Sequence, residues 1–519
     1  MSFGNISLVK RTFLFFLILL PLSVPILLKP GEQLYSDHLG KFALGHSVLE
    51  NGFRSGNLVL PSKEMDPEAK YCPTECIRIG EEWISPFPVA LGYVYALVLP
   101  WAGIDGVYWA VAILVSLSLL LLGILWKWDP YYLGTLMLAS PFMINGYFFP
   151  DVGIAAFLYI FGSFLLLSDS SKSSLGISLF AGFVSALAGW FRIEALVFPG
   201  LFWFLLMVKN LRSLEERRRI LGYGFGILIG AGILLGIQYL LYGHPMGPRF
   251  AFNQPGVFLA PWKKWEIYSG LLFANPNRLG FFGYSPFFLV LFLFGSYRIF
   301  FRTDFLGGKE EASVRDLFCF SGMLAFAALV ITAPNDGIID FGSRYLHLSL
   351  PAFAGVFLLF LDSIPEKRKK FVQLGSIAIL LFSVYITFSY TQILSKYGRK
   401  TTKLNRIYLE QKPDLVVVQI RTYSQILGKY FFQTPAVWLM KEPDVRDFFS
   451  RNSPDKFDKI LFVETKAAIL QSISDSDPFS KNEYYKSIVN ALGPEFERTY
   501  VDNREDVLIF SMERKRIPE

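Results

Sequence analysis

The sequence predicts a multi-span α-helical membrane protein that ends in a smaller α/β domain. Of its 519 residues, 53% are hydrophobic and only 18% are charged, whereas a soluble protein carries about 25% charge. Apolar runs of about 16–23 residues, each closed by polar residues, follow one another as far as residue 391. After residue 391, short β-like runs alternate with polar helical stretches, which is typical of an α/β domain.

The apolar runs predict about eleven transmembrane helices. We place them at 12–28, 107–126, 131–149, 152–168, 175–191, 195–208, 220–242, 284–300, 317–333, 344–361 and 371–391. The first run lacks the small residues of a signal-peptide cleavage site, so we expect it to remain as a membrane span.

Basic residues predict the orientation of the chain. Short basic segments at Lys10-Arg11, Lys209–Arg219 and Glu366–Lys370 mark the cytoplasmic side. The first two segments lie on the same side only if an even number of spans separates them, which requires that the extra apolar run 86–103 does not cross the membrane. We therefore expect a proline-broken, re-entrant or interfacial helix there. Because the net charge of +7 gathers in such loops, it does not indicate binding to nucleic acid.

The same count of spans predicts which segments lie outside the cytoplasm, if the chain is a multi-pass protein of the cytoplasmic membrane. They are loop 29–106, the turn at Pro150-Asp151, loop 243–283 and the tail 392–519. We therefore expect a membrane domain of residues 1–391 and a soluble extracytoplasmic α/β domain of residues 392–519.

The tail contains three β-like runs and two polar helical stretches. They are Leu415–Ile420, Lys459–Val463, Asp506–Phe510, Lys466–Ser474 and Asn482–Leu492. No glycine-rich phosphate loop opens either helical stretch.

Two cysteines lie close together in loop 29–106. Cys72 and Cys76 can form a local disulfide on the outer side, or they can be two unpaired thiols. No second pair of ligands accompanies them, which argues against zinc.

Two carboxylates lie at the outer edge of the membrane. Asp37 follows the first span, and a carboxylate there needs water, a cation or a substrate. It can take a proton from a hydroxyl or amine, or hold a divalent cation. Asp151 can complete a metal site or position an acceptor. Each residue can instead be a helix cap, before His38 and Val152 respectively.

Arginines interrupt the apolar pattern at the same edge. Arg192 can pair with Glu194, or its guanidinium can bind a phosphate. Arg344, followed by Tyr345, can snorkel to the headgroups or contact a phosphate in a polar pocket. Loop 243–283 has an excess of positive charge and three aromatic residues, which suits an anionic headgroup or simple anchoring at the interface. These residues are His244, Arg249, Lys263, Lys264, Arg278, Trp262, Trp265 and Tyr268.

Five segments, in this order, resemble the GT-C superfamily of membrane glycosyltransferases, in particular the protein O-mannosyltransferases and lipid A aminoarabinose transferases. The segments are Tyr35–Gly52 with its early Asp37, the proline-led run from Ser85 to Gly103, Gly189–Glu194, Arg278–Pro286 and Phe341–Leu346 with Pro351. The resemblance covers about residues 12–391 and leaves the tail outside.

The resemblance implies a GT-C-like fold and a sugar donor carried on a polyprenyl phosphate. It implies transfer at the outer face to a lipid, glycan or protein acceptor, with Asp37 as catalytic base. It also implies that Asp151 assists through a metal or acceptor contact, and that Arg192 or Arg344 meets the lipid phosphate; we add Arg249 as a third candidate. Glu194 and Tyr345 would support them. Some relatives have a second acid where this chain has His38, so the dependence on Mg²⁺ or Mn²⁺ stays open.

Two other functions remain alternatives. A glycolipid or polymer transporter would be favoured by charges within the spans, whereas here they lie at the edges. A catalytically inactive scaffold would use its tail to bind a partner in the cell envelope.

Overall fold

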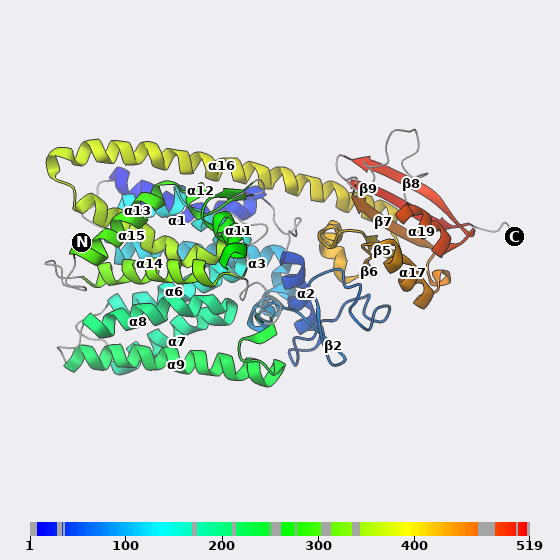
Figure 1. Cartoon of the computed structure of the whole chain (residues 1–519), viewed down its shortest axis with the longest axis horizontal. Helices are drawn as coiled ribbons and strands as arrows, with labels where there is room; N and C mark the ends of the chain where they lie inside the picture. The colour runs from blue at the N-terminus through cyan, green and yellow to red at the C-terminus, as the bar shows by residue number, and fades with distance from the viewer. Residues whose placement is uncertain are drawn as a thin grey trace. The chain divides into compact units, whose positions relative to one another are not determined.

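The computed structural model of the chain describes most of its residues (Figure 1). They are 8–28, 34, 37–168, 174–209, 214–248, 250, 261–275, 278–302, 313–334, 343–465, 483–504 and 507–515. They form two compact units. Residues 1–28 and 105–395 make a helical unit, and residues 29–104 and 396–519 make a sheet unit.

Within the described part of the chain, seven helices are long and apolar enough to cross a membrane, as expected of a multi-pass membrane protein. They are Leu8–Leu27, Val89–Leu125, Pro150–Ser168, Glu216–Tyr242, Val314–Thr332, Arg344–Asp362 and Lys370–Ile393. Two shorter apolar helices, Leu175–Phe191 and Phe287–Phe301, accompany them. The expected number of about eleven spans is therefore matched only in part.

The helical unit is built from α-helices joined by short 3₁₀ and π turns. Its elements are α1 (Leu8–Leu28), α4 (Pro130–Leu138), α5 (Phe142–Phe148), α6 (Pro150–Ser168), α7 (Leu175–Phe191), η3 (Ile193–Leu196), α8 (Val197–Lys209), α9 (Leu214–Tyr242), α11 (Pro261–Leu272), β3 (Ala274–Asn275), β4 (Arg278–Leu279), α12 (Phe281–Tyr284), α13 (Phe287–Tyr297), η4 (Arg298–Arg302), α14 (Val314–Thr332), η6 (Arg344–Ser349) and α15 (Leu350–Asp362). Two further helices, α3 (Val89–Leu125) and α16 (Glu366–Gln411), have one part in each unit.

The predicted span 131–149 is wrong as a single helix. It is divided into α4 and α5 at Ser140 and Pro141. Proline has no N–H to donate to the preceding turn, so the helix ends before it. The Ser140 hydroxyl bonds on both sides of the break, donating to the carbonyl of Leu136 at 2.5 Å and accepting from the N–H of Phe142 at 3.2 Å.

The run 86–103 and the span 107–126 are joined in the single helix α3. The helix is interrupted at Gly103, where φ is 62° and ψ is −162°. Glycine adopts this conformation without the steric cost that a Cβ brings. Pro100 lies in the turn before it. The proline-broken helix expected at 86–103 is therefore not a separate element, but the first part of α3.

The sheet unit contains a five-stranded mixed sheet with the strand order β6-β5-β7-β9-β8. Its strands are β5 (Leu415–Val418), β6 (Ala436–Trp438), β7 (Lys459–Thr465), β8 (Phe496–Arg504) and β9 (Val507–Arg514). Strand β5 pairs in parallel with β6 and β7, whereas β9 pairs antiparallel with β7 and β8. The expected α/β character of the tail is confirmed.

Helical segments accompany the sheet. They are η7 (Arg421–Phe432), α17 (Glu442–Arg451), η8 (Pro454–Lys456) and α19 (Glu483–Leu492). Of the predicted helical stretches, Asn482–Leu492 corresponds to α19, and Lys466–Ser474 lies outside the described residues.

Residues 29–104 fold with the tail, not with the membrane helices as expected for loop 29–106. They contribute α2 (Asp37–Glu50) and the hairpin of β1 (Ile77–Ile79) and β2 (Glu82–Ile84). Tyr71 lies in the same apolar core as the sheet and meets the ring of Phe448 edge-on at 5.8 Å. Its carbonyl accepts the N–H of Trp438 at 2.8 Å. An aromatic residue buried in this core ties the loop to the tail.

Candidate functional site

Asp37 is the first residue of α2, in the sheet unit. The first turn of this helix is closely packed. A Cβ added at Gly40 would lie 2.7 Å from the ring of Phe87, 2.9 Å from Oγ1 of Thr74 and 3.1 Å from Oε2 of Glu75. Residues three apart on a helix share a face. The glycine therefore lets the Thr74-Glu75 segment approach the face of α2 that begins at Asp37.

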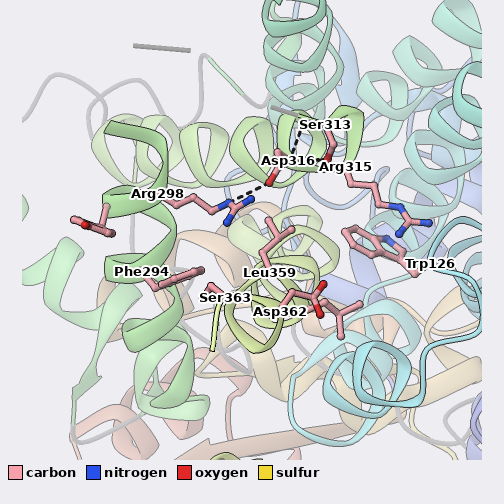
Figure 2. A pocket seen from close by; sticks show the side chains of 11 residues that line it. Trp126, Phe294, Arg298, Ser313, Arg315, Asp316, Leu359, Asp362 and Ser363 are labelled. Carbon is pink, nitrogen blue, oxygen red and sulfur yellow. Dashed lines mark hydrogen bonds and ion pairs between the residues drawn. The ribbon is translucent and has the colours of Figure 1, made fainter. Parts of the chain in front are cut away.

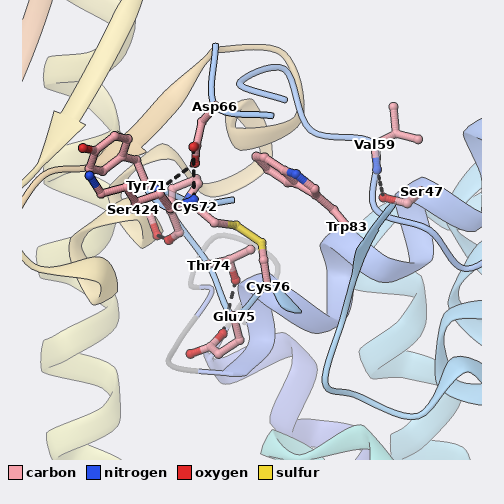
Figure 3. Close-up of a disulfide and its surroundings, with 12 residues drawn as sticks. Ser47, Val59, Asp66, Tyr71, Cys72, Thr74, Glu75, Cys76, Trp83 and Ser424 are labelled. Atoms are coloured by element: carbon pink, nitrogen blue, oxygen red, sulfur yellow. Dashed lines mark hydrogen bonds between the residues drawn. A yellow bond between two sulfur atoms is a disulfide. The ribbon is translucent and has the colours of Figure 1, made fainter. Parts of the chain in front are cut away.

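A disulfide closes the loop that carries Glu75 (Figure 3). Cys72 and Cys76 form this bond, which settles the question that the sequence left open. The Thr74 hydroxyl donates to Oε2 of Glu75 at 3.2 Å. From η7 in the tail, the Ser424 hydroxyl donates to the carbonyl of Pro73 at 2.8 Å. The position of Glu75 is thus fixed both covalently and by the C-terminal domain.

The segment before the disulfide is held by Asp66. Its Oδ1 accepts the backbone N–H of Lys70 at 3.0 Å, and its Oδ2 accepts that of Tyr71 at 2.6 Å. Burial raises the pKa of this carboxyl against the effect of both bonds. The chain therefore reaches Cys72 from a turn that these two hydrogen bonds fix.

Electrostatics distinguish Glu75 from an ordinary surface acid. Burial, and then the negative charge of Asp37, raise the pKa of Glu75, while Arg421 acts in the opposite direction. Burial lowers the pKa of Arg421, and Glu75 opposes that effect. The Arg421 guanidinium lies 4.1 Å from the centre of the Trp438 ring. Two carboxyl groups and one arginine thus interact here, and the arginine comes from the tail.

Glu75 was missed by the sequence analysis, which treated Cys72 and Cys76 only as a possible bridge. The signal was an acid enclosed by two cysteines four residues apart. His38, named as a substitute for a second acid, is the second residue of α2 and is 2% exposed. Among the described residues, no group of three or more histidine, cysteine, aspartate or glutamate side chains could hold a metal ion.

A second charged cluster lies in the helical unit. Asp151 is in the first turn of α6, and Arg192 follows the end of α7 in an extended conformation. Nη1 of Arg192 lies 3.0 Å from Oδ2 of Asp151, and Nη2 of Arg192 pairs with Oε1 of Glu194. The Arg192 side chain is 1% exposed and that of Asp151 is fully buried. Buried charged groups are expected to be paired, and Arg192 here pairs with two buried or partly buried carboxylates.

Aromatic rings surround this cluster. The Arg192 guanidinium lies 5.3 Å from the ring centre of Tyr345. The Arg344 guanidinium lies 4.8 Å from the ring of Phe149 and 5.9 Å from that of Tyr345. Arg344 follows Ser343, whose φ of 59° turns the chain into η6. Because Arg344 is only 6% exposed, snorkelling to the headgroups does not describe it.

His347 lies in the same region. It is 1% exposed, and its ring stacks on that of Phe142 at 4.8 Å. Neither of its ring nitrogens has a hydrogen-bond partner among the described residues.

The structure therefore brings together Asp151, Arg192 and Glu194, with Tyr345 beside Arg192 and Arg344. Asp37 and His38 belong to the other unit. Arg249 lies outside the described residues.

No family model matches the chain, and no curated protein matches it. Among solved structures, it is similar to the apo crystal structure of the oligosaccharyltransferase of Archaeoglobus fulgidus. The identity is 10% and the TM-score is 0.49, over 89% of this chain and 70% of that chain. A likeness of this size does not assign an activity.

Proposed function

We propose that this chain is a membrane glycosyltransferase. It moves a sugar from a polyprenyl-phosphate donor to a lipid, glycan or protein acceptor on the extracytoplasmic face, and Asp37 is the catalytic base. The observation that carries the proposal is the close packing of the Thr74-Glu75 segment against the first turn of α2, which begins at Asp37, together with the raised pKa of Glu75. Groups with perturbed pKa values that are held beside a second charged group are common at functional sites.

The reaction is a single displacement at the anomeric carbon. A hydroxyl or amine of the acceptor attacks this carbon, and its proton passes to the Asp37 carboxylate. The bond from the anomeric carbon to the phosphate oxygen breaks, and the polyprenyl phosphate leaves with the bonding electron pair. At the anomeric carbon one bond forms and one breaks, and attack on the side opposite the leaving phosphate inverts the configuration of the sugar.

Glu75 supports Asp37 in this scheme. Two carboxyl groups that interact strongly share their protons as a pair. The negative charge of Asp37 contributes to the raised pKa of Glu75, so the two carboxyl groups act on each other. Arg421 limits the rise in the Glu75 pKa. Glu75 is therefore a positioning and electrostatic residue, and the C-terminal domain takes part in the chemistry through Arg421.

The donor phosphate is assigned to Arg344 before Arg192. Both were expected to bind phosphate, as was Arg249. Arg192 already pairs with Asp151 and Glu194, and these two acids would repel a phosphate. The Arg344 guanidinium lies over the rings of Phe149 and Tyr345. In this proposal Asp151 and Glu194 position Arg192 and do not bind a metal.

The test is to replace Asp37 with asparagine in the full-length chain. We expect transfer to fall by a factor of 10² to 10⁴, the usual contribution of a general base, while the protein stays folded in the membrane. Lipid-linked sugars and glycosylated products are compared in a deletion strain complemented with the parent or with Asp37→Asn. Glu50→Gln is the control, because Glu50 lies at the other end of α2 and is exposed.

Full activity of Asp37→Asn would remove Asp37 from the mechanism. Movement of a glycolipid across liposomes containing the purified chain, with no covalent product, would favour the transporter instead.

A further inference from the structure

The helical unit has a second charged site at the opposite end of its helices from Arg192. The segment Arg344–Asp362 begins beside Arg192 and has 19 residues. At a rise of 1.5 Å per residue it spans about 28 Å, close to the roughly 30 Å of a bilayer's hydrocarbon core. Its last residue, Asp362, lines a cavity of about 580 Å³. This is the size range of small-molecule sites.

The cavity lies where several helices end (Figure 2). Trp126 follows α3, Tyr297 and Arg298 mark the end of α13, Arg315 is in the first turn of α14, and Asp362 ends α15. Trp and Tyr residues at helix ends are typical of the level of the lipid headgroups.

The basic side of the cavity is fixed by contacts. Nε of Arg298 donates to Oδ1 of Asp316 at 3.2 Å, and Asp316 also closes the capping box of α14 with Ser313. Nη2 of Arg315 donates to the carbonyl of Leu125 at 2.9 Å, and its guanidinium lies 5.3 Å from the Trp126 ring. An adjoining cavity of about 260 Å³ shares Trp126 and Arg315.

The adjoining cavity adds a third arginine, Arg219. Asp362, in contrast, is exposed and has no hydrogen-bond or ion-pair partner among the described residues. The lining thus offers several guanidinium groups and one separate carboxylate, which matches a ligand with a phosphate and an amine.

We propose that this cavity binds the phosphoethanolamine headgroup of a membrane lipid. The phosphate lies against Arg315, because a guanidinium binds phosphate oxygens through charge-assisted hydrogen bonds, and Arg298, which is paired with Asp316, borders the site. The ammonium lies against Asp362. Basic pockets between transmembrane helices are suited to lipid headgroups. The site does not depend on the proposed glycosyl transfer.

Native mass spectrometry of the full-length chain in detergent tests this. The chain is titrated with phosphatidylethanolamine, phosphatidylcholine, phosphatidylglycerol and soluble glycerophosphoethanolamine. We expect phosphatidylethanolamine to bind about tenfold more tightly than phosphatidylcholine, whose quaternary amine has no N–H to donate. Asp362→Asn should abolish this preference, and Arg315→Gln should weaken all three phospholipids about tenfold. Arg368→Gln is the control, because Arg368 is exposed at the start of α16 and does not line the cavity.

Equal binding of the three phospholipids by the parent would overturn the proposal, as would an unchanged preference in Asp362→Asn. Binding of glycerophosphoethanolamine as tight as that of the lipid would show a site for a soluble ligand and would also overturn it. Arg315 has structural contacts, so a fall in the yield of its variant reports on folding. The exposed Asp362 keeps the test decisive in that case.

Discussion

The two charged clusters each combine two carboxyl groups with one arginine, yet they are arranged in opposite ways. In the helical unit, Arg192 lies between Asp151 and Glu194 and pairs with both. In the sheet unit, Asp37 and Glu75 act on each other, and Arg421 stacks on Trp438 without forming an ion pair with Glu75. A cluster whose charges are paired stabilises the fold, whereas neighbouring like charges cost free energy and are typical of functional sites.

The largest expected effect is on the paired cluster. Arg192→Gln would leave Asp151 and Glu194 without their cation in a buried site. Removing one partner of a buried ion pair costs about 3–5 kcal/mol. We expect a clearly lower midpoint of thermal unfolding, measured on the full-length chain in detergent by size-exclusion chromatography after heating.

Arg217→Gln is the matched control for that experiment, because Arg217 is exposed in the first turns of α9. If Arg192→Gln unfolds at the same temperature as this control, then the cluster does not stabilise the helical unit.

The next effect concerns the cluster of Asp37, Glu75 and Arg421. Glu75→Gln removes the titrating group but keeps the size of the side chain. We expect transfer to fall about 10- to 100-fold with little change in thermal stability, and the acid limb of the pH–rate profile to move, because Asp37 then titrates without its neighbour. Steady-state rates across pH, with lipid-linked donor, measure both.

Glu82→Gln serves as its control, because Glu82 is an exposed acid of the same loop in β2. An unchanged pH profile in Glu75→Gln would mean that Glu75 has only a structural role. If Asp37→Asn loses transfer while Glu75→Gln keeps it, then Asp37 remains the proposed base and Glu75 has no role in the reaction.

The sequence predicted these two clusters to different extents. Asp151, Arg192, Glu194 and Arg344 could be identified because a charge within an apolar pattern is conspicuous. Glu75 is less conspicuous, because it lies in a polar loop where an acid is ordinary and its only sequence signal is its place between Cys72 and Cys76. The disulfide and the missing side chain of Gly40 let it approach α2.

The fold shows the same contrast. Long apolar helices such as α6 and α14 were predicted well, since their boundaries follow from composition. The division at Pro141 and the packing of Tyr71 into the tail's core were missed. Residues 71 and 448 are far apart in the chain, and no local pattern reveals that they meet.

A smaller effect is expected from opening the disulfide. The variant Cys72→Ser/Cys76→Ser frees the loop, but the Ser424 bond to Pro73 and the turn at Asp66 remain. We expect transfer to fall several-fold, less than in Glu75→Gln, because Glu75 is displaced for only part of the time. Treating the parent with a reductant should reproduce the loss, and it should have no further effect on the double variant. Equal activity with and without the disulfide would show that the bond does not position Glu75.

The smallest effect is expected where the first loop joins the tail at the surface. Lys70 lies 2.8 Å from Oδ2 of Asp447, and Arg451 lies 3.0 Å from its Oδ1. The hydrogen bonds from Lys70 and Tyr71 lower the pKa of Asp447 to about 2. Because the folded state lowers this pKa, the pairing stabilises the fold above about pH 4, the usual range of an unfolded aspartate. The stabilisation is lost as the pH falls towards about 2.

Asp447→Asn should therefore lower the midpoint of thermal unfolding slightly at pH 6, and the difference from the parent should vanish as the pH falls from about 4 towards 2. The effect is small because both side chains are about one third exposed or more, and water screens their charges. Thermal scans of both proteins at matched pH values measure it. Asp455→Asn is a useful comparison, since Asp455 is a more exposed acid of the same unit, with its side chain 73% exposed. A difference between Asp447→Asn and the parent that persists unchanged at pH 2 would mean that hydrogen bonding by the Asp447 side chain, and not its charge, joins the loop to the tail.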